Sequence, residues 1–123
     1  MAFYLESYER AAEFQPDRFN PVALAGSGHV KVVLACLESG QFIPVHSPAA
    51  DLVLTVLEGR GTVVAGGREE SVAPGCVVHV PAGEPRGIRA ETRLVALHVV
   101  APPPTAGDHQ GVMEGIRRGK YRP

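Results

Sequence analysis

Short apolar runs separated by glycine or proline dominate the middle of the chain. Residues 28–38 (GHVKVVLACLE) are dense in Val and Leu and end at Ser39-Gly40, as a strand ends at a turn. Residues 51–58 (DLVLTVLE) are apolar at both alternating sets of positions, which is typical of a strand covered on both faces. A Gly-Gly pair at 66–67 is a two-residue hairpin signal. The pattern therefore predicts strands at 28–38, 51–58, 62–65, 68–72, 76–80 and 93–101.

Short strands at this even spacing favour an all-β fold, a jelly roll or small barrel. They also suggest where the chain divides. We expect an N-terminal arm over 1–26, the barrel over 27–101, and a Pro-rich linker with a short C-terminal helix or tail over 102–123.

The two arms carry different signals. Residues 5–14 are compatible with one short helix. The triple proline at 102–104 ends the last strand, because proline has no N–H to donate to a ladder. Residues 108–120 predict a helix that begins at Asp108 and ends before Gly119. Two internal glycines weaken it by up to about 1 kcal/mol each, so we expect it to dock on a surface. Its apolar face would consist of Val112, Met113 and Ile116.

Composition excludes several classes of protein. The chain has 123 residues, of which 45 % are apolar and 20 % charged, which fits one globular domain. A net charge of −1 gives no reason to expect nucleic-acid or membrane binding. Charged residues interrupt the N-terminal segment where a secretory signal needs an apolar core, and we expect a cytoplasmic protein. Cys36 and Cys76 are too few for a disulfide framework and are interpreted as small core residues.

Two segments carry a recognisable pattern. Residues 40–59 read G-QFIPV-H-S-P-AAD-L-VLTVLE-G, and residues 75–90 read G-CVVHV-P-A-G-EP-R-GIR-A. Together they resemble the two motifs of the cupin family, G-x5-H-x-H-x3-E-x6-G and G-x5-P-x-G-x2-H-x3-N. The resemblance implies a double-stranded β-helix, the same jelly-roll barrel that the strand spacing indicates independently.

The resemblance also implies a metal site, and this chain departs from it. In cupins three His and a Glu commonly hold a transition metal, and His46 keeps the first of these positions. Pro48, Leu52 and Arg86 occupy the other three. Proline and leucine offer no ligand, and a guanidinium about 4 Å from a divalent ion costs roughly 8 kcal/mol at an effective dielectric constant near 20. We therefore expect no metal at the usual position. A displaced site formed by His46 with His79 or His98 stays open.

Arg86 and His46 each allow two interpretations. Arg86 is either a clamp for a carboxylate or phosphate in a pocket, or a partner of Glu84 or Asp51 on the rim of the barrel. His46 is either a ligand-binding or titratable group, or a residue packed in the wall. Apolar walls for a pocket would come from the shared strand face of Leu52, Leu54 and Val56, which would equally suit a filled core.

Enzymatic alternatives depend on groups whose placement the sequence leaves open. Metal-free cupin epimerases and isomerases use a His base and a Tyr acid inside the barrel. Here Tyr4, Tyr8 and Tyr121 all lie in the arms, so this chemistry requires an arm to fold over the mouth. Cupin dioxygenases and metal isomerases need the replaced ligands. Sugar-sensing regulators carry a helix-turn-helix, for which the residues after 101 leave no room.

The interpretation that fits best is a stand-alone cupin domain that binds a small, possibly anionic metabolite without a cofactor. The alternative is a cupin-type enzyme, either metal-free or using a displaced metal. We also expect a homodimer, because the apolar residues of the arms need a surface and an exchanged N-terminal segment would cover a sheet edge.

Overall fold

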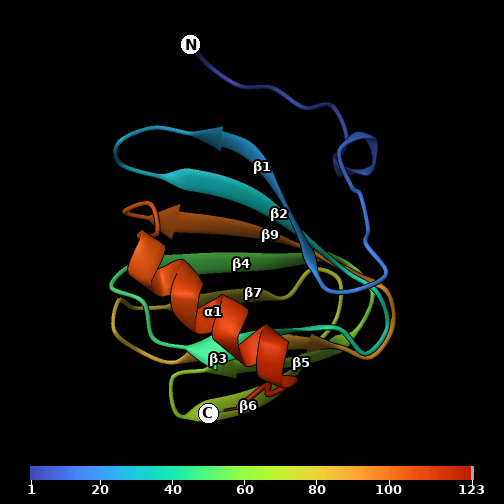
Figure 1. The fold of residues 1–123 in the computed structure, drawn as a ribbon. Coiled ribbons are helices and arrows are strands. Elements are labelled where there is room, and N and C mark those ends of the chain that lie inside the picture. The colour runs from blue at the N-terminus through green and yellow to red at the C-terminus, as the bar shows by residue number, and fades with distance from the viewer. Residues whose placement is uncertain (123) are drawn as a thin grey trace.

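The structure is a computed structural model that describes residues 1–122, and Pro123 lies outside the described residues. β-Strands are the main regular structure of the described chain, with one 3-10 turn near the N-terminus and one helix near the C-terminus (Figure 1). The elements in chain order are η1 (Tyr8–Arg10), β1 (Asn20–Gly26), β2 (Lys31–Leu37), β3 (Phe42–His46), β4 (Asp51–Glu58), β5 (Gly61–Ala65), β6 (Arg68–Val72), β7 (Val77–Val80), β8 (Arg86–Ala90), β9 (Leu94–Ala101) and α1 (Ala106–Arg118).

The strands form two antiparallel sheets that pack face to face. The larger sheet has the order β1-β2-β9-β4-β7, and the smaller has the order β3-β8-β5-β6. Sequence neighbours such as β3 and β4 lie in different sheets, so the chain winds around the barrel as a jelly roll does. The predicted fold class is confirmed.

Strand prediction succeeded where the apolar pattern is dense. Strand β4 has the predicted bounds, and the Gly-Gly pair at 66–67 joins β5 to β6 as expected. Three strands were missed. Strand β1 contains Pro21, β3 contains Pro44, and β8 contains Gly87 between charged residues, so none of them shows a regular apolar run. The larger sheet consequently begins at Asn20, earlier than the expected barrel start at residue 27. Because β1 is an edge strand, its proline disturbs no inner ladder.

The main core fills the space between the sheets at one end of the barrel. Its members are buried alternating residues of both sheets, among them Leu54, Ile88 and Leu94, each 1 % exposed or less. A second cluster lies on the outer face of the larger sheet, where Leu34, Cys36 and Val95 are covered by the N-terminal arm. Both cysteines are free, and Cys36 is buried as expected.

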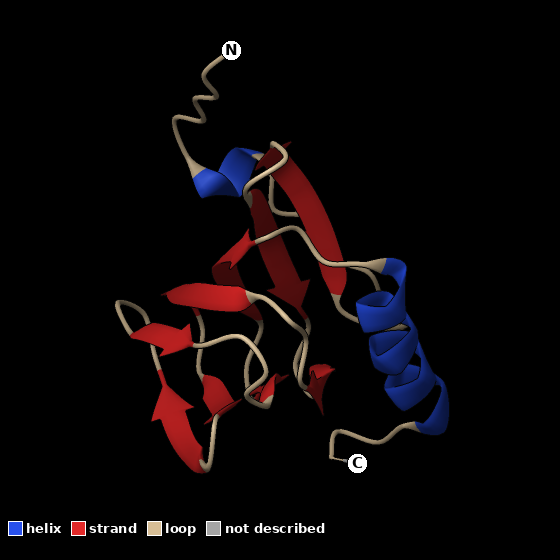
Figure 2. Cartoon of the chain, turned by 90° about the vertical axis from the view of Figure 1, so that its left-hand side faces the viewer, coloured by secondary structure: helices blue, strands red, loops and turns tan. Residues whose placement is uncertain are grey.

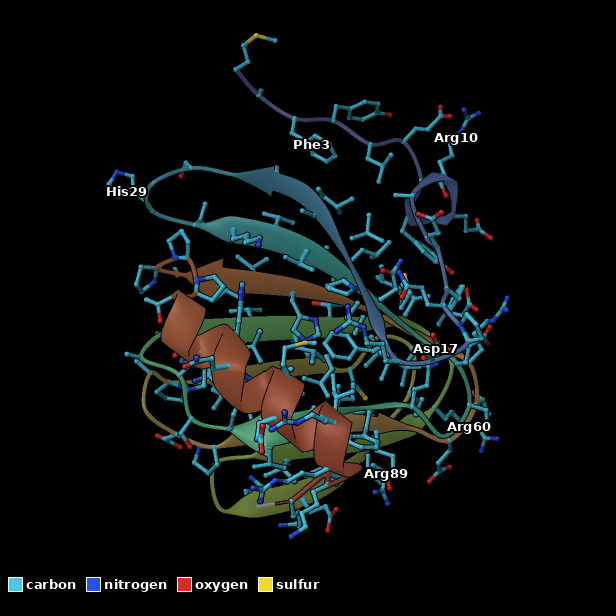
Figure 3. The ribbon with its side chains drawn as sticks, in the orientation of Figure 1. Phe3, Arg10, Asp17, His29, Arg60 and Arg89 are labelled. Carbon is cyan, nitrogen blue, oxygen red and sulfur yellow. The ribbon has the colours of Figure 1, made fainter. Side chains whose placement is uncertain are left out.

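The N-terminal arm is less helical than predicted. Only η1 forms within residues 5–14, and the arm is held to the outer face of the larger sheet by Tyr8, whose hydroxyl donates to Glu58 over 3.0 Å. Before η1 the chain leaves the barrel, and Phe3 lies on this outlying segment (Figure 3). Phe3 is 51 % exposed and Tyr4 is 85 % exposed. On β7, Val77 is also exposed, at 68 %.

Helix α1 begins at Ala106, before the expected Asp108. Thr105 is the N-cap, and Asp108 completes a capping box by accepting from the Thr105 N–H over 2.9 Å. Gly119 ends the helix in the left-handed conformation, as predicted. The helix packs closely on β3, since a Cβ on Gly115 would lie 2.6 Å from the Pro44 Cβ.

Helix α1 stands on one side of the barrel and crosses in front of both sheets (Figures 1 and 2). Within the described residues, no helix is long and apolar enough to cross a membrane.

Candidate functional site

A cavity of about 350 Å³ lies between the two sheets and under α1. Its interior is formed by both sheets, and its rim by α1 and the segment that enters β1. The walls are mainly apolar, with a few polar side chains, which is the usual character of a small-molecule site. The polar and charged side chains among its lining residues are Arg18, Lys31, His46, Arg86, His98, Asp108 and His109.

The register of the larger sheet explains how polar groups reach this cavity. Leu54 pairs with His98, and His98 pairs with Val33, so these three form one inward-facing row across β4, β9 and β2. The next row toward the core holds Ala35 and Ala96 and belongs to the main apolar cluster. His98 is therefore the point on β9 at which the barrel interior changes from packed core to cavity wall.

His46 reaches the cavity through an irregularity in β3. The pairing of β3 with β8 shifts between Ile43 and His46, which places two residues three positions apart on the same inner face. A regular strand would turn alternate residues inward, and a β-bulge changes that order. His46 Nδ1 lies 2.9 Å from the Pro44 carbonyl oxygen. Because a carbonyl only accepts, the neutral imidazole carries its proton on Nδ1 and leaves Nε2 as an acceptor.

Arg86 is the only buried charged residue among those the structure describes, at 5 % exposed. It lies opposite His46 in the β3–β8 pair and shares the inward face of β8 with Ile88. Its Nη2 donates to the Pro81 carbonyl oxygen over 3.0 Å, and the Glu84 carbonyl lies farther away at 3.4 Å. No carboxylate of residues 1–122 forms an ion pair with it.

Neither expected carboxylate, that of Glu84 or that of Asp51, forms an ion pair with Arg86. The Asp51 carboxylate instead accepts from the Ala82 N–H over 2.9 Å and lies 3.4 Å from His79 Nε2. Burial lowers the pKa of the Arg86 guanidinium, and distant carboxylates, Asp51 first among them, only partly offset this effect. A guanidinium stays charged under these conditions, so the cavity contains a buried cation without a counter-ion.

Two of the histidines that line the cavity, His46 and His98, are held neutral near pH 7. Burial lowers the pKa of His46, and the nearby Arg86 charge lowers it further, against hydrogen bonds to backbone groups. Burial also lowers the pKa of His98 to about 4. His98 retains some accessible surface, and this surface faces the cavity. The site therefore offers the uncharged imidazoles of His46 and His98 near the buried guanidinium of Arg86.

The structure brings together most of the residues singled out in the sequence. His46, Arg86, Leu52, Leu54 and His98 all line the cavity. The four aligned cupin positions, His46, Pro48, Leu52 and Arg86, thus line one cavity.

Two of the predicted residues lie elsewhere. Val56 is 1 % exposed and belongs to the packed core beneath the cavity, where it does not line the wall. His79 pairs with Val53 in the β4–β7 ladder, so both side chains point out of the barrel, where His79 meets Asp51. It is therefore removed from any displaced metal site with His46 and His98.

The lining residues do not fit a cupin metal. Pro48 and Leu52 line the cavity at two ligand positions and offer no donor atoms, while Arg86 brings a positive charge. Among the described residues, no group of three or more His, Cys, Asp or Glu side chains is arranged to hold a metal ion.

The His–Tyr arrangement of metal-free cupin isomerases is not assembled among the described residues. Tyr8 lies against the outer face of the larger sheet, and Tyr4 is exposed. Tyr121 is buried outside the smaller sheet, where its ring packs edge-on against Phe42 at 5.8 Å and under the Arg89 guanidinium at 4.8 Å. Tyr121 thus anchors the C-terminal segment, and no tyrosine of residues 1–122 lines the cavity.

Sequence reasoning did not assign the two basic residues at the rim, Arg18 and Lys31. Lys31 had a usable signal. It begins the alternation Lys31, Val33, Ala35, Leu37 along β2, whose other members line the cavity or join the core. Arg18 had none, because it lies before the first strand in a segment without periodicity.

Comparison with known proteins agrees with the half-motifs. A family model described as "Cupin domain" matches residues 33–100. A solved structure from Thermus thermophilus is 32 % identical over 80 % of this chain and 96 % of its own, with a TM-score of 0.76. An RmlC-like cupin from Desulfovibrio desulfuricans is 32 % identical over 81 % of this chain and 99 % of its own, with a TM-score of 0.71.

At lower identity, a double-stranded β-helix protein from Klebsiella pneumoniae is 20 % identical, covers 80 % of this chain and 89 % of its own, and has a TM-score of 0.73. This likeness concerns the fold alone. No curated protein gives a significant match to the chain.

Proposed function

We propose that this chain, which belongs to the cupin family, is a binding domain for a small anionic metabolite held in the barrel by Arg86. The observation that carries the proposal is the buried guanidinium. Arg86 is 5 % exposed, lines the cavity, and has backbone carbonyls as its hydrogen-bond partners in place of a carboxylate. A ligand carboxylate or phosphate would supply the missing charge and accept two parallel hydrogen bonds.

The other lining residues support a small ligand with an apolar part. Leu52 and Leu54 provide an apolar wall, and the neutral imidazoles of His46 and His98 offer hydrogen-bonding groups beside the charge. A cavity of about 350 Å³ has room for a metabolite of modest size.

The proposal is tested by calorimetric titration with matched probes. Butyrate and its uncharged analogue butyramide have nearly the same shape, and inorganic phosphate serves as a third probe. We expect butyrate or phosphate to bind and butyramide not to bind. Replacing Arg86 with Met should weaken anion binding about ten- to hundredfold, since a hydrogen bond to a charged group contributes roughly 1.5–3 kcal/mol.

Arg60→Met is the matched control, because Arg60 is an exposed cation at the far end of the barrel from the β1–β2 loop (Figure 3). Equal affinity of the Arg86→Met variant and the unmodified protein for every anion would contradict the proposal.

The competing function is metal-free acid–base catalysis by His46. Its support is that the imidazole is neutral, with its proton on Nδ1 toward Pro44 and a lone pair on Nε2. A general base of this kind needs a partner acid, and no tyrosine of the described chain lines the cavity. Turnover of a keto acid or sugar phosphate that survives chelators and disappears in His46→Ala would establish the enzyme in place of the binding domain.

A further inference from the structure

We infer that the ligand carries two anionic groups, one held by Arg86 inside the cavity and the second by Arg18 and Lys31 at its rim. This inference rests on the proposed function, because it extends the same site. It assigns a second subsite to residues that no motif marks, and it narrows the ligand class to a short, elongated dianion with an apolar spacer.

The first observation is that every basic side chain lining the cavity lacks a carboxylate partner within residues 1–122. These side chains are Arg18, Lys31 and Arg86. Elsewhere the chain pairs its arginines readily, for instance Arg93 with Glu38 at 2.9 Å and Arg122 with Glu69 at 3.0 Å. None of the ion pairs of the described chain involves a residue that lines the cavity.

The second observation is the position of Lys31. It lies on the inward side of β2 and pairs with Val100 of β9. Val33, the next inward-facing residue along β2, pairs with His98. With adjacent strands about 4.8 Å apart, its Cα lies roughly 8 Å from that of His98. Lys31 is only partly buried, so its ammonium group is available to a ligand that extends outward from the interior.

The third observation is the contact that Arg18 makes across the rim. Its Nη1 lies 2.9 Å from the Sδ of Met113 on α1. A thioether is an uncharged, weak acceptor, so this contact does not compensate the guanidinium charge. The contact does hold the guanidinium between the entrance to β1 and α1. A carboxylate arriving there would replace the sulfur with a much stronger acceptor.

Asp108 forms no ion pair with the cations of the cavity. It is the one acidic residue of the described chain that lines the cavity, and its carboxylate is committed to the capping box, accepting from Thr105 Oγ1 over 3.1 Å as well as from the Thr105 N–H. Among the arginine, lysine and acidic side chains that line the cavity, three positive charges face one negative charge, an excess of two. Two carboxylates, or one carboxylate and one phosphoryl group, would balance it.

The ligand's middle would be apolar. Besides the rim cations and Arg86, the cavity is lined mainly by apolar side chains, among them Val33, Ile43 and Leu52. A spacer of a few methylene groups fits these walls, whereas a heavily hydroxylated sugar would leave its hydroxyls without partners.

The test compares acids that differ only in the second charge. The probes are the unbranched dicarboxylates from succinate to pimelate and the monocarboxylates of equal chain length, titrated calorimetrically at low salt. Phosphonoalkyl carboxylates of the same lengths distinguish a phosphoryl group from a carboxylate as the second anion. The proteins are the unmodified chain, Arg18→Gln, Lys31→Gln, their double variant, and Arg60→Gln as control.

We expect one dicarboxylate length to bind about tenfold or more tightly than its monocarboxylate partner. The double variant should lose that advantage and keep its affinity for the monocarboxylate, whereas Arg60→Gln should behave as the unmodified chain. Arg18→Lys, which retains the charge but loses the planar fork, should keep part of the advantage.

Each failure has a distinct meaning. Monocarboxylates and dicarboxylates of equal affinity, both dependent on Arg86, would overturn this inference and leave the proposed function standing. A dicarboxylate advantage that persists in the double variant would also overturn the rim subsite. Absence of binding by every acid would overturn both.

Discussion

Replacing Arg86 with Met should leave the ligand-free protein at least as stable as the unmodified chain. Most buried substitutions destabilise a domain, typically by about 0.5–3 kcal/mol. Arg86 differs because the residue is only 5 % exposed and its guanidinium forms no ion pair within the described chain. Met fills the volume of the aliphatic stem and removes the charge.

The magnitude follows from two opposing terms. The substitution loses one hydrogen bond of normal length, to the Pro81 carbonyl at 3.0 Å, and two long ones of 3.4 Å to the Glu84 carbonyl. A charge-assisted bond contributes about 1.5–3 kcal/mol. Against this, the desolvation penalty of a buried ion is several kcal/mol. Pro81 and Glu84 are exposed, so water can satisfy their carbonyls after the change. The net effect should lie between zero and about 2 kcal/mol of stabilisation.

Thermal unfolding without and with a binding anion measures the stability of the ligand-free protein and the stabilisation that the anion adds. Without ligand, Tm of Arg86→Met should equal or exceed that of the unmodified chain by up to about 8 °C, at roughly 4 °C per kcal/mol. With anion at about 100 times Kd, the unmodified chain should gain about 2.7 kcal/mol and the variant almost nothing. A variant that loses more than about 2 kcal/mol without ligand, or gains as much from the anion as the unmodified chain, would refute the idea that Arg86 is held ready for an anion.

The remaining predictions concern pH, metal, α1 and assembly. The pKa of His98 is about 4 in the folded chain and 6.5 in its usual state, so the unfolded chain takes up the proton first as pH falls. The stability present above pH 6.5 should therefore be lost progressively toward pH 4. In urea unfolding, the free energy of unfolding of His98→Leu should depend less on pH over this range than that of the unmodified chain. Elemental analysis of the purified protein should find no stoichiometric transition metal, and near one equivalent that disappears in His46→Ala would contradict this. Gly115→Ala should destabilise the protein by about 1–3 kcal/mol, because its Cβ would lie 2.6 Å from a proline carbon of β3, whereas Gly111→Ala, which meets nothing within 4 Å, should stabilise it by up to about 1 kcal/mol. The exposed aromatic residues of the N-terminal arm should be covered in a homodimer, and light scattering that reports only monomer at micromolar concentration would count against it.

The sequence predicted the scaffold well because the relevant signals are local. A dense apolar run marked β4, a Gly-Gly pair marked the β5–β6 hairpin, and the glycine after α1 marked the helix end. Each signal depends on the conformational preference of a few neighbouring residues. Alignment of the half-motifs then brought His46, Pro48 and Leu52 to one cavity, as expected for the family.

The missed parts depend on contacts between segments far apart in the chain. The direction of His46 depends on a register shift in β3 that no local pattern reveals. The outward position of His79 follows from its pairing with Val53 on β4. Because β4 carries apolar residues on both faces, its sequence pattern does not show which face lies inside the barrel. Whether Arg86 has a counter-ion depends on where two carboxylates point, so the choice between clamp and rim pair required the structure.

The Arg18–Met113 contact is the feature that the sequence could least predict. Its two residues are separated by most of the chain, and neither belongs to a motif. Periodicity in the sequence cannot predict a contact of this kind. It could have placed Lys31 on the inner face, because the alternation along β2 includes it.

The most direct measurement of the central claim is the side-chain Nε–H resonance of Arg86 in a ¹⁵N-labelled sample, assigned by its disappearance in Arg86→Met. If the buried guanidinium is an anion site, adding a carboxylate should shift this resonance along a saturable curve with the Kd found by calorimetry, while the exposed Arg60 resonance moves little. A resonance that stays in place while the acid binds elsewhere, or that moves no more than that of Arg60, would contradict the account.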